Sequence, residues 1–151
     1  MAALFGFVGL CLLVGAAGGS VTADAVRTWY PLLTAPPFTP PNWVFAPVWT
    51  LLYVVIGVSG WLVWLRPGSR RALRSWGWQL AANAAWSPAF FGVRNPGLAL
   101  LVIAAMLATT GATIGMFYRR RPLAAWLLLP YLAWSLYAAY LNAGFWWLNR
   151  G

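Results

Sequence analysis

Residues 95–118 have the sequence NPGLALLVIAAMLATTGATIGMFY and contain no charged side chain. A helix rises about 1.5 Å per residue, so roughly 20 apolar residues are needed to cross about 30 Å of hydrocarbon. This stretch is long enough and apolar enough to do so. It therefore predicts a membrane-spanning helix at about 96–118.

The same pattern continues on both sides of this stretch. Charged residues divide the chain into uncharged runs at 2–23, 28–65, 75–93, 95–118 and 122–149. The run 28–65 is too long for one crossing, and the prolines in its first half do not allow a continuous helix. These prolines are Pro31, Pro36, Pro37, Pro40 and Pro41.

The runs predict an all-α membrane protein with a single domain over residues 1–151. We expect a bundle of five transmembrane helices and a long Pro-rich first loop at 21–41. The expected helices lie at about 3–20, 43–65, 73–92, 96–118 and 122–147. Prolines stiffen a loop of this length, so it can either act as a lid over a cavity or place its Trp and Tyr side chains at the level of the lipid headgroups.

The composition agrees with lipid as the solvent and excludes several kinds of site. Only 7% of residues are charged, against about one quarter in a soluble domain. With no His, one Cys and one acid, the chain lacks the ligands for a zinc or non-haem iron site and the residues of a Ser-His-Asp triad. We therefore expect no metal, no cofactor and no conventional acid–base catalysis. The arginines occur in short clusters between apolar runs, which argues against nucleic-acid binding.

The arginines also predict an orientation in the membrane. Five crossings place Arg66, Arg70, Arg71, Arg74, Arg119, Arg120 and Arg121 on the side of the N-terminus, and Arg27, Arg94 and Arg150 on the other side. The positive-inside rule then places the N-terminus in the cytoplasm if the membrane is a bacterial inner membrane. Val21-Thr22-Ala23 has the small residues of a signal-peptidase site, but no basic residue precedes Arg27, so we expect an uncleaved first helix.

Polar and aromatic side chains recur at helical spacing on three of the expected helices. These stripes are Phe45, Trp49, Tyr53 and Ile56; Gln79, Asn83, Trp86, Ser87 and Phe90; and Tyr131, Trp134, Ala138 and Asn142. Polar side chains in a membrane helix are costly when they face lipid, so these faces should point inward. They either pack the bundle, with amides joining the helices, or line a cavity for a large, flat, mostly apolar ligand.

Three segments resemble the signature segments of the TspO/translocator protein family, also called tryptophan-rich sensory proteins or peripheral-type benzodiazepine receptors. They are PPFTPPNWVFAPVWTLLY at 36–53, NAAWSPAFFG at 83–92, and PYLAW with YAAYLN at 130–134 and 137–142. Their order and spacing agree with the family over Trp29 to Asn149, which is most of the chain.

The resemblance implies that the first loop covers a pocket for porphyrins such as protoporphyrin and for related flat ligands. It assigns Tyr30, Pro40 and Trp43 to the lid, and Phe45, Trp49, Tyr53, Asn83, Trp86, Trp134, Ala138 and Asn142 to the pocket. Some bacterial members are credited with light-driven oxidative breakdown of protoporphyrin through tryptophans. Trp49 and Trp134 occupy the matching places here and would be the catalytic residues of such an activity.

Two departures limit what the resemblance implies. Many members carry a basic residue before the first signature proline, where this chain has Ala35, so Arg27 is the remaining basic residue nearby. The sterol motif of the animal proteins requires a basic residue within five positions of its Tyr, but the next one after Tyr140 is Arg150. Sterol binding is therefore not supported.

The function expected from the sequence is non-covalent binding of a free-base tetrapyrrole, because no His is present to ligate haem iron. Binding would regulate tetrapyrrole levels or stress signalling. The alternatives are light-driven porphyrin degradation and, with less support, transport of a porphyrin or lipid. The resemblance also implies a homodimer, and the alanine series Ala81, Ala85 and Ala89 predicts its contact.

Overall fold

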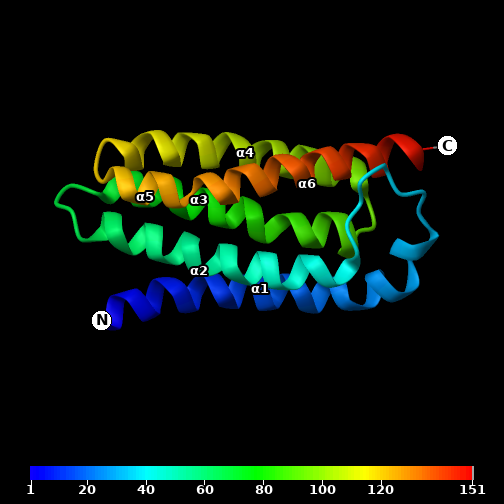
Figure 1. Ribbon diagram of the computed structural model, residues 1–151, viewed down its shortest axis with the longest axis horizontal. Helices are drawn as coiled ribbons and strands as arrows, with labels where there is room; N and C mark the ends of the chain where they lie inside the picture. The colour runs from blue at the N-terminus through cyan, green and yellow to red at the C-terminus, as the bar shows by residue number, and fades with distance from the viewer. Residues whose placement is uncertain (151) are drawn as a thin grey trace.

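The computed structural model describes residues 1–150, and every regular element in that range is helical. Figure 1 shows the helices aligned along the long axis of the molecule, with the two termini at opposite ends. The elements are α1 (Ala2–Thr28), η1 (Tyr30–Leu32), η2 (Asn42–Val44), α2 (Phe45–Trp64), α3 (Arg70–Ser87), the π-helical turn η3 (Pro88–Gly92), α4 (Pro96–Tyr118), α5 (Pro122–Leu127) and α6 (Leu129–Leu148).

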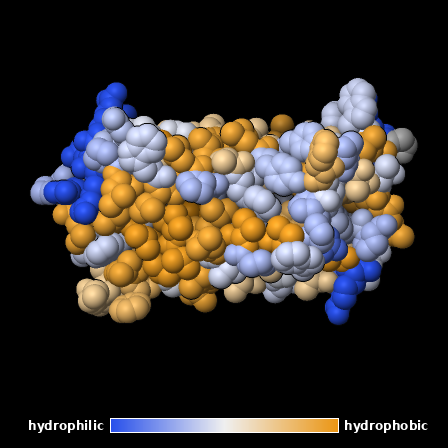
Figure 2. Space-filling model, viewed as in Figure 1, coloured by the Kyte–Doolittle hydropathy of each residue, from blue (hydrophilic) through white to orange (hydrophobic). Residues whose placement is uncertain are grey.

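Four segments are long and apolar enough to cross a membrane. They are Ala2–Thr28, Asn42–Trp64, Pro96–Tyr118 and Pro122–Leu148. The remaining long helix, α3, begins with Arg70 and Arg71 and is less apolar, but it lies within the bundle. Apolar surface fills the middle of the face shown in Figure 2, and the most hydrophilic residues lie toward its two ends. The chain is therefore an all-helical membrane protein.

Helix boundaries differ from the sequence expectations at three places. Helix α1 continues to Thr28 rather than ending near residue 20, because residues 21–28 contain neither Pro nor Gly. Helix α3 begins at Arg70 rather than near 73. The last expected helix is divided at Leu128, because Pro130 has no N–H to donate to the carbonyl of Trp126.

Small residues bring α1 and α2 into close contact at one end of the pair. A Cβ atom added to Gly57 would lie 2.7 Å from the Cα atom of Val8, which leaves no space for a side chain. Next to this contact, Trp76 of α3 donates a hydrogen bond from Nε1 to the Ile56 carbonyl at 3.1 Å. Elsewhere α1 is poorly covered, and only Cys11 and Ala25 are buried along it.

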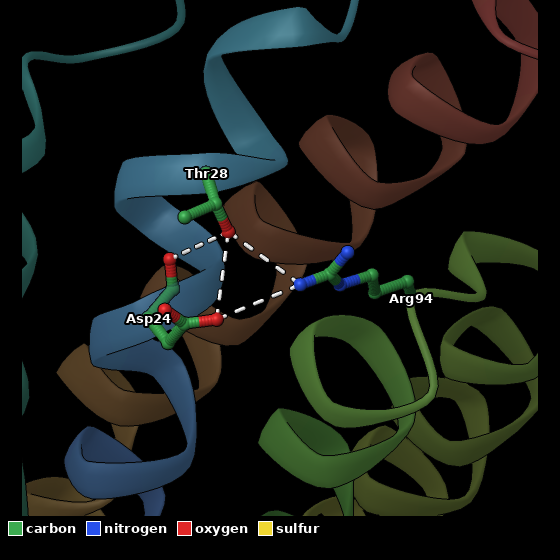
Figure 3. A network of polar contacts seen from close by, with 3 residues as sticks. All are labelled: Asp24, Thr28 and Arg94. Carbon is green, nitrogen blue, oxygen red and sulfur yellow. Dashed lines mark hydrogen bonds and ion pairs between the residues drawn. The ribbon is translucent and has the colours of Figure 1, made fainter.

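A polar contact joins the other end of α1 to the connection between η3 and α4. The Arg94 guanidinium lies 3.6 Å from the Asp24 carboxylate and 3.5 Å from the Thr28 hydroxyl (Figure 3). Arg94 and Asp24 are exposed, so the pair contributes at most about 1 kcal/mol. Because Asp24 is the only acidic residue in the sequence, it offsets one of the three arginines predicted for this side of the membrane.

Candidate functional site

A cavity of about 490 Å³ lies among α1, α2, α3, η3 and α6. It is lined by Leu12, Gly15, Ala16, Gly18, Gly19, Thr22, Ala23, Val26, Tyr30, Asn42, Phe45, Ala46, Trp49, Thr50, Tyr53, Asn83, Trp86, Ser87, Phe90, Phe91, Met106, Ala138, Leu141, Asn142 and Phe145. No charged side chain is among them. The volume is within the range of about 300–1,000 Å³ typical of small-molecule sites.

Aromatic rings form much of the cavity wall. Trp86 stacks on Phe90 with ring centroids 5.4 Å apart, and the Tyr30 and Phe145 centroids are 5.0 Å apart. On α2, Trp49 lies 5.8 Å from Tyr53, which is its neighbour one turn along the helix. These planes come from five different elements, so a flat ligand can contact ring faces and edges on more than one side.

Two asparagines are held in fixed orientations at this wall. Asn83 accepts a hydrogen bond from the Tyr53 hydroxyl at 2.6 Å and donates one to the Tyr131 hydroxyl at 3.0 Å. Asn142 accepts from the Trp86 indole at 3.0 Å and donates to the Pro96 carbonyl at 2.7 Å. Both asparagines are buried, so their amides orient the neighbouring aromatic rings without exposure to lipid.

Two hydrogen bonds join the loop between α1 and α2 to α6 near the cavity. The Tyr140 hydroxyl donates to the Pro37 carbonyl at 3.0 Å, and the Tyr137 hydroxyl donates to the Phe38 carbonyl. Phe38 has a φ of 63°, which is uncommon for a residue with a side chain, and its ring is exposed. The hydrogen bond from Tyr137 therefore restrains an otherwise unfavourable backbone conformation.

Most residues predicted from the sequence lie around the cavity. Those in its lining are Tyr30, Phe45, Trp49, Tyr53, Asn83, Trp86, Ala138 and Asn142. Three others lie outside the lining: Pro40, Trp43 and Trp134. Trp43 is 74% exposed, and Trp134 packs edge-on against Phe45 with centroids 6.0 Å apart. The polar stripe on α3 points inward as expected, although Gln79 is fully buried away from the lining.

Helix α1 forms one side of the cavity, which no motif in the sequence predicts. Its contribution consists of small or aliphatic residues, and at Gly15 an added Cβ would lie 2.6 Å from the Tyr53 ring. The spacing of Gly15 and Gly19 resembles an ordinary helix-packing motif, so it did not distinguish a cavity wall from a contact between helices.

The cavity lining contains no charged side chain and offers only neutral, non-covalent contacts. Burial, together with the neighbouring Tyr137, raises the pKa of the Tyr30 phenol to about 12, so it stays neutral at physiological pH. Within residues 1–150 no cluster of His, Cys, Asp or Glu could hold a metal ion. The available interactions are aromatic stacking and hydrogen bonds to neutral amides and hydroxyls.

Comparison with known proteins identifies the family. Residues 7–148 match the model of the TspO/MBR family. The chain is 41% identical to the tryptophan-rich protein TspO of Archaeoglobus fulgidus over 140 residues, which cover 91% of each chain. It is 38% identical to the translocator protein of Bos taurus, over 96% of this chain and 89% of that one. It is 36% identical to the tryptophan-rich sensory protein of Cereibacter sphaeroides, over 85% of this chain and 84% of that one. This chain belongs to the TspO/MBR family.

Proposed function

We propose that this protein binds a protoporphyrin-type tetrapyrrole in the cavity between α1, α2, α3 and α6. The observation that carries the proposal is an uncharged cavity of about 490 Å³ whose aromatic walls are oriented by buried asparagines. A tetrapyrrole is flat, aromatic and largely apolar, so it complements ring faces such as those of Trp49 and Trp86. No His is present to ligate iron, so the free base is the favoured form and is a ligand rather than a cofactor.

The proposed architecture is a bundle of five transmembrane helices with the first loop as a lid. Helix α2 ends at Trp64 and α4 begins at Pro96 at the opposite end of the molecule (Figure 1), so α3 must traverse the same distance between them. The loop contacts α6 through Pro37 and Phe38, close to the cavity residue Tyr30. If the membrane is a bacterial inner membrane, the N-terminus is cytoplasmic in this proposal, because most arginines lie at its end. Alkaline phosphatase fused after α6 should then be active on the periplasmic side.

Ligand affinity measured on purified protein tests the proposed function. Protoporphyrin IX should quench tryptophan fluorescence and shift its own absorbance bands when added to protein in nanodiscs. Trp49→Ala should weaken binding by roughly 2- to 12-fold, which corresponds to an aromatic stacking contribution of about 0.5–1.5 kcal/mol. Ala138→Phe should abolish binding by filling the cavity.

Trp147→Ala is the matched control for these variants. Trp147 is 61% exposed and contacts Arg150 at the end of α6, away from the cavity. This substitution should leave the affinity unchanged. Equal affinities for wild type, Trp49→Ala and Ala138→Phe would place any bound porphyrin elsewhere and refute the proposal.

One observation bears on light-driven porphyrin degradation as a second function. Trp49 lines the cavity and can contact a bound tetrapyrrole, whereas Trp134 packs against the lining residue Phe45 and is not itself in the lining. Of the two tryptophans that the family resemblance suggested, Trp49 is therefore the better placed for such a reaction.

A further inference from the structure

The exposed residues of the cavity wall are confined to one side. They are Leu12, Ala16, Gly19 and Ala23 on α1, and Asn42, Ala46 and Thr50 at the beginning of α2 and in the turn before it. The lining residues from α3, η3, α4 and α6 are all buried or half-buried. The cavity is therefore closed toward the rest of the bundle and open along the α1–α2 side.

The packing of these two helices explains where this opening lies. At Gly57 and Val8 the helices are in backbone contact, so no opening exists at that level. Further along, Gly15 faces the Tyr53 ring, while a Cβ added to Gly19 would meet no atom within 4 Å. Helix α1 therefore contacts α2 at Gly15 and approaches α3 at Gly18, where an added Cβ would lie 3.3 Å from the Ser87 hydroxyl, and the open space beside it lies at Gly19.

The opening lies within the membrane-spanning part of both helices. Ala16 and Gly19 belong to the apolar helix Ala2–Thr28, and Ala46 and Thr50 belong to the span Asn42–Trp64. Its rim is formed by small or apolar side chains, apart from Thr50 and Asn42. The Thr50 hydroxyl already donates to the Ala46 carbonyl at 2.8 Å, so it presents little polarity to lipid.

We propose that the opening between α1 and α2 is a lateral entrance through which the ligand passes between the bilayer and the cavity. This inference rests on the proposed function for the identity of the ligand. It adds that the ligand class is membrane-dissolved: flat apolar compounds that partition into lipid before they bind. A ligand confined to water would instead have to enter from the end of the bundle, beneath the first loop.

Access of a thiol reagent tests the entrance without relying on porphyrin. Ala138 is buried in the cavity wall on α6, so Ala138→Cys in a Cys11→Ala background places a single thiol inside. In nanodiscs, membrane-soluble benzyl methanethiosulfonate should label this thiol, and the charged trimethylammonium ethyl analogue should label it at least about tenfold more slowly. Adding Ala16→Phe should slow benzyl labelling by roughly tenfold, equivalent to about 1.4 kcal/mol in the barrier.

Ala17→Phe is the matched control, because Ala17 is also exposed on α1 but does not line the cavity. It should leave labelling unchanged. The proposal is overturned if Ala16→Phe and Ala17→Phe label at the same rate, or if the charged reagent reacts as fast as the benzyl reagent. A change from dimer to monomer with Ala16→Phe would assign this surface to subunit contact and also overturn it.

Porphyrin kinetics supply the second measurement. An obstacle in an entrance slows entry and exit alike, so Ala16→Phe should reduce the association and dissociation rates of protoporphyrin IX by similar factors with little change in Kd. The thiol labelling can follow the expected order while the protein binds no porphyrin. That result would refute the proposed function and leave the entrance standing. Normal porphyrin affinity with unchanged rates in Ala16→Phe would refute the entrance alone.

Discussion

The side chain of Asn149 pairs with the backbone of Thr34 through two hydrogen bonds. The Thr34 N–H donates to Asn149 Oδ1 at 2.8 Å, and Asn149 Nδ2 donates to the Thr34 carbonyl at 3.0 Å. The same Nδ2 also donates to the Phe145 carbonyl at 2.8 Å, which fixes the amide at the end of α6. The pair therefore attaches the first loop to the end of the last helix, although the two residues are 115 positions apart in the sequence.

Asn149→Ala should release this part of the loop. It removes both hydrogen bonds to Thr34, each worth about 0.5–1.5 kcal/mol net, so exchange of the backbone amide at residue 34 should accelerate by roughly 5- to 150-fold. Hydrogen–deuterium exchange in nanodiscs measures this. Asn149→Asp keeps an acceptor for the Thr34 N–H and should give a smaller effect. Unchanged exchange in both variants would mean that other contacts hold the loop.

Gly144→Ala should push the first loop away from α6, because the added methyl group would clash with Pro36. A Cβ at this position would lie 2.5 Å from the Cβ of Pro36, closer than side-chain atoms approach one another. The expected result is faster proteolysis of the first loop and a lower thermal midpoint. Gly111→Ala on α4 is the control, because its Cβ would meet no atom within 4 Å. If both variants behave like wild type, the Pro36 contact does not restrain the loop.

Asn83→Leu should destabilise the bundle and weaken porphyrin binding together. It leaves the buried hydroxyls of Tyr53 and Tyr131 without their amide partner, at about 1–3 kcal/mol for each unpaired group. Tyr53→Phe removes only the 2.6 Å bond to Asn83 and should cost less. Unfolding in denaturant, combined with protoporphyrin titration, separates the two effects. The double variant Asn83→Leu/Tyr53→Phe should be no less stable than Asn83→Leu alone, because Asn83 and Tyr53 act as a unit. A double variant that is less stable by the sum of the two single effects would show that the two residues contribute independently.

Trp49→Phe should slow any light-driven loss of bound protoporphyrin more than Trp134→Phe does. Trp49 lines the cavity, whereas Trp134 contacts the lining residue Phe45 and is not in the lining. Both variants should retain binding, because phenylalanine preserves an aromatic face. Absorbance under illumination, compared with a dark sample at equal occupancy, measures the difference. Bleaching at the wild-type rate in both variants would exclude these tryptophans from the reaction.

Ala85→Leu should convert a homodimer into monomers. Ala81 and Ala85 are exposed on α3 and remain available for the predicted subunit contact, but Ala89 is 6% exposed and is not. The π-helical turn that begins at Pro88 changes the helical repeat and rotates Ala89 into the core. Light scattering in detergent measures the mass. A dimer that survives Ala85→Leu but dissociates with Gly111→Leu would move the contact to α4.

Much of the fold could be predicted because charged residues, together with the prolines of the run 28–65, separate the expected spans. The helix at 96–118 agrees with α4 at both ends, since Asn95 caps it by accepting from the Leu98 N–H and arginines follow Tyr118. The inward face of α3 could be predicted because amides such as Asn83 are costly in lipid. The π turn at Pro88 has no comparable signal, so the burial of Ala89 could not be foreseen.

The site could be predicted only in part, because sequence spacing shows which face of a helix points inward but not which side chains on that face reach the cavity. Trp134 lies on the same helix as the cavity residue Ala138, but its ring packs edge-on against Phe45 and is not part of the lining. The wall contributed by α1 could not be predicted, because glycine and alanine carry no chemical signature of a ligand.

The sparse burial of α1 has a consequence for how the protein assembles. Only Cys11 and Ala25 are buried on this helix, and its backbone contact with α2 is at Gly57 and Val8. Helices insert into the membrane before they associate, and of the four apolar spans α1 has the smallest buried share to hold it to the others. We expect α2 to α6 to associate without it, so that the arrival of α1 is the last step of folding and the one that creates a cavity from an open groove.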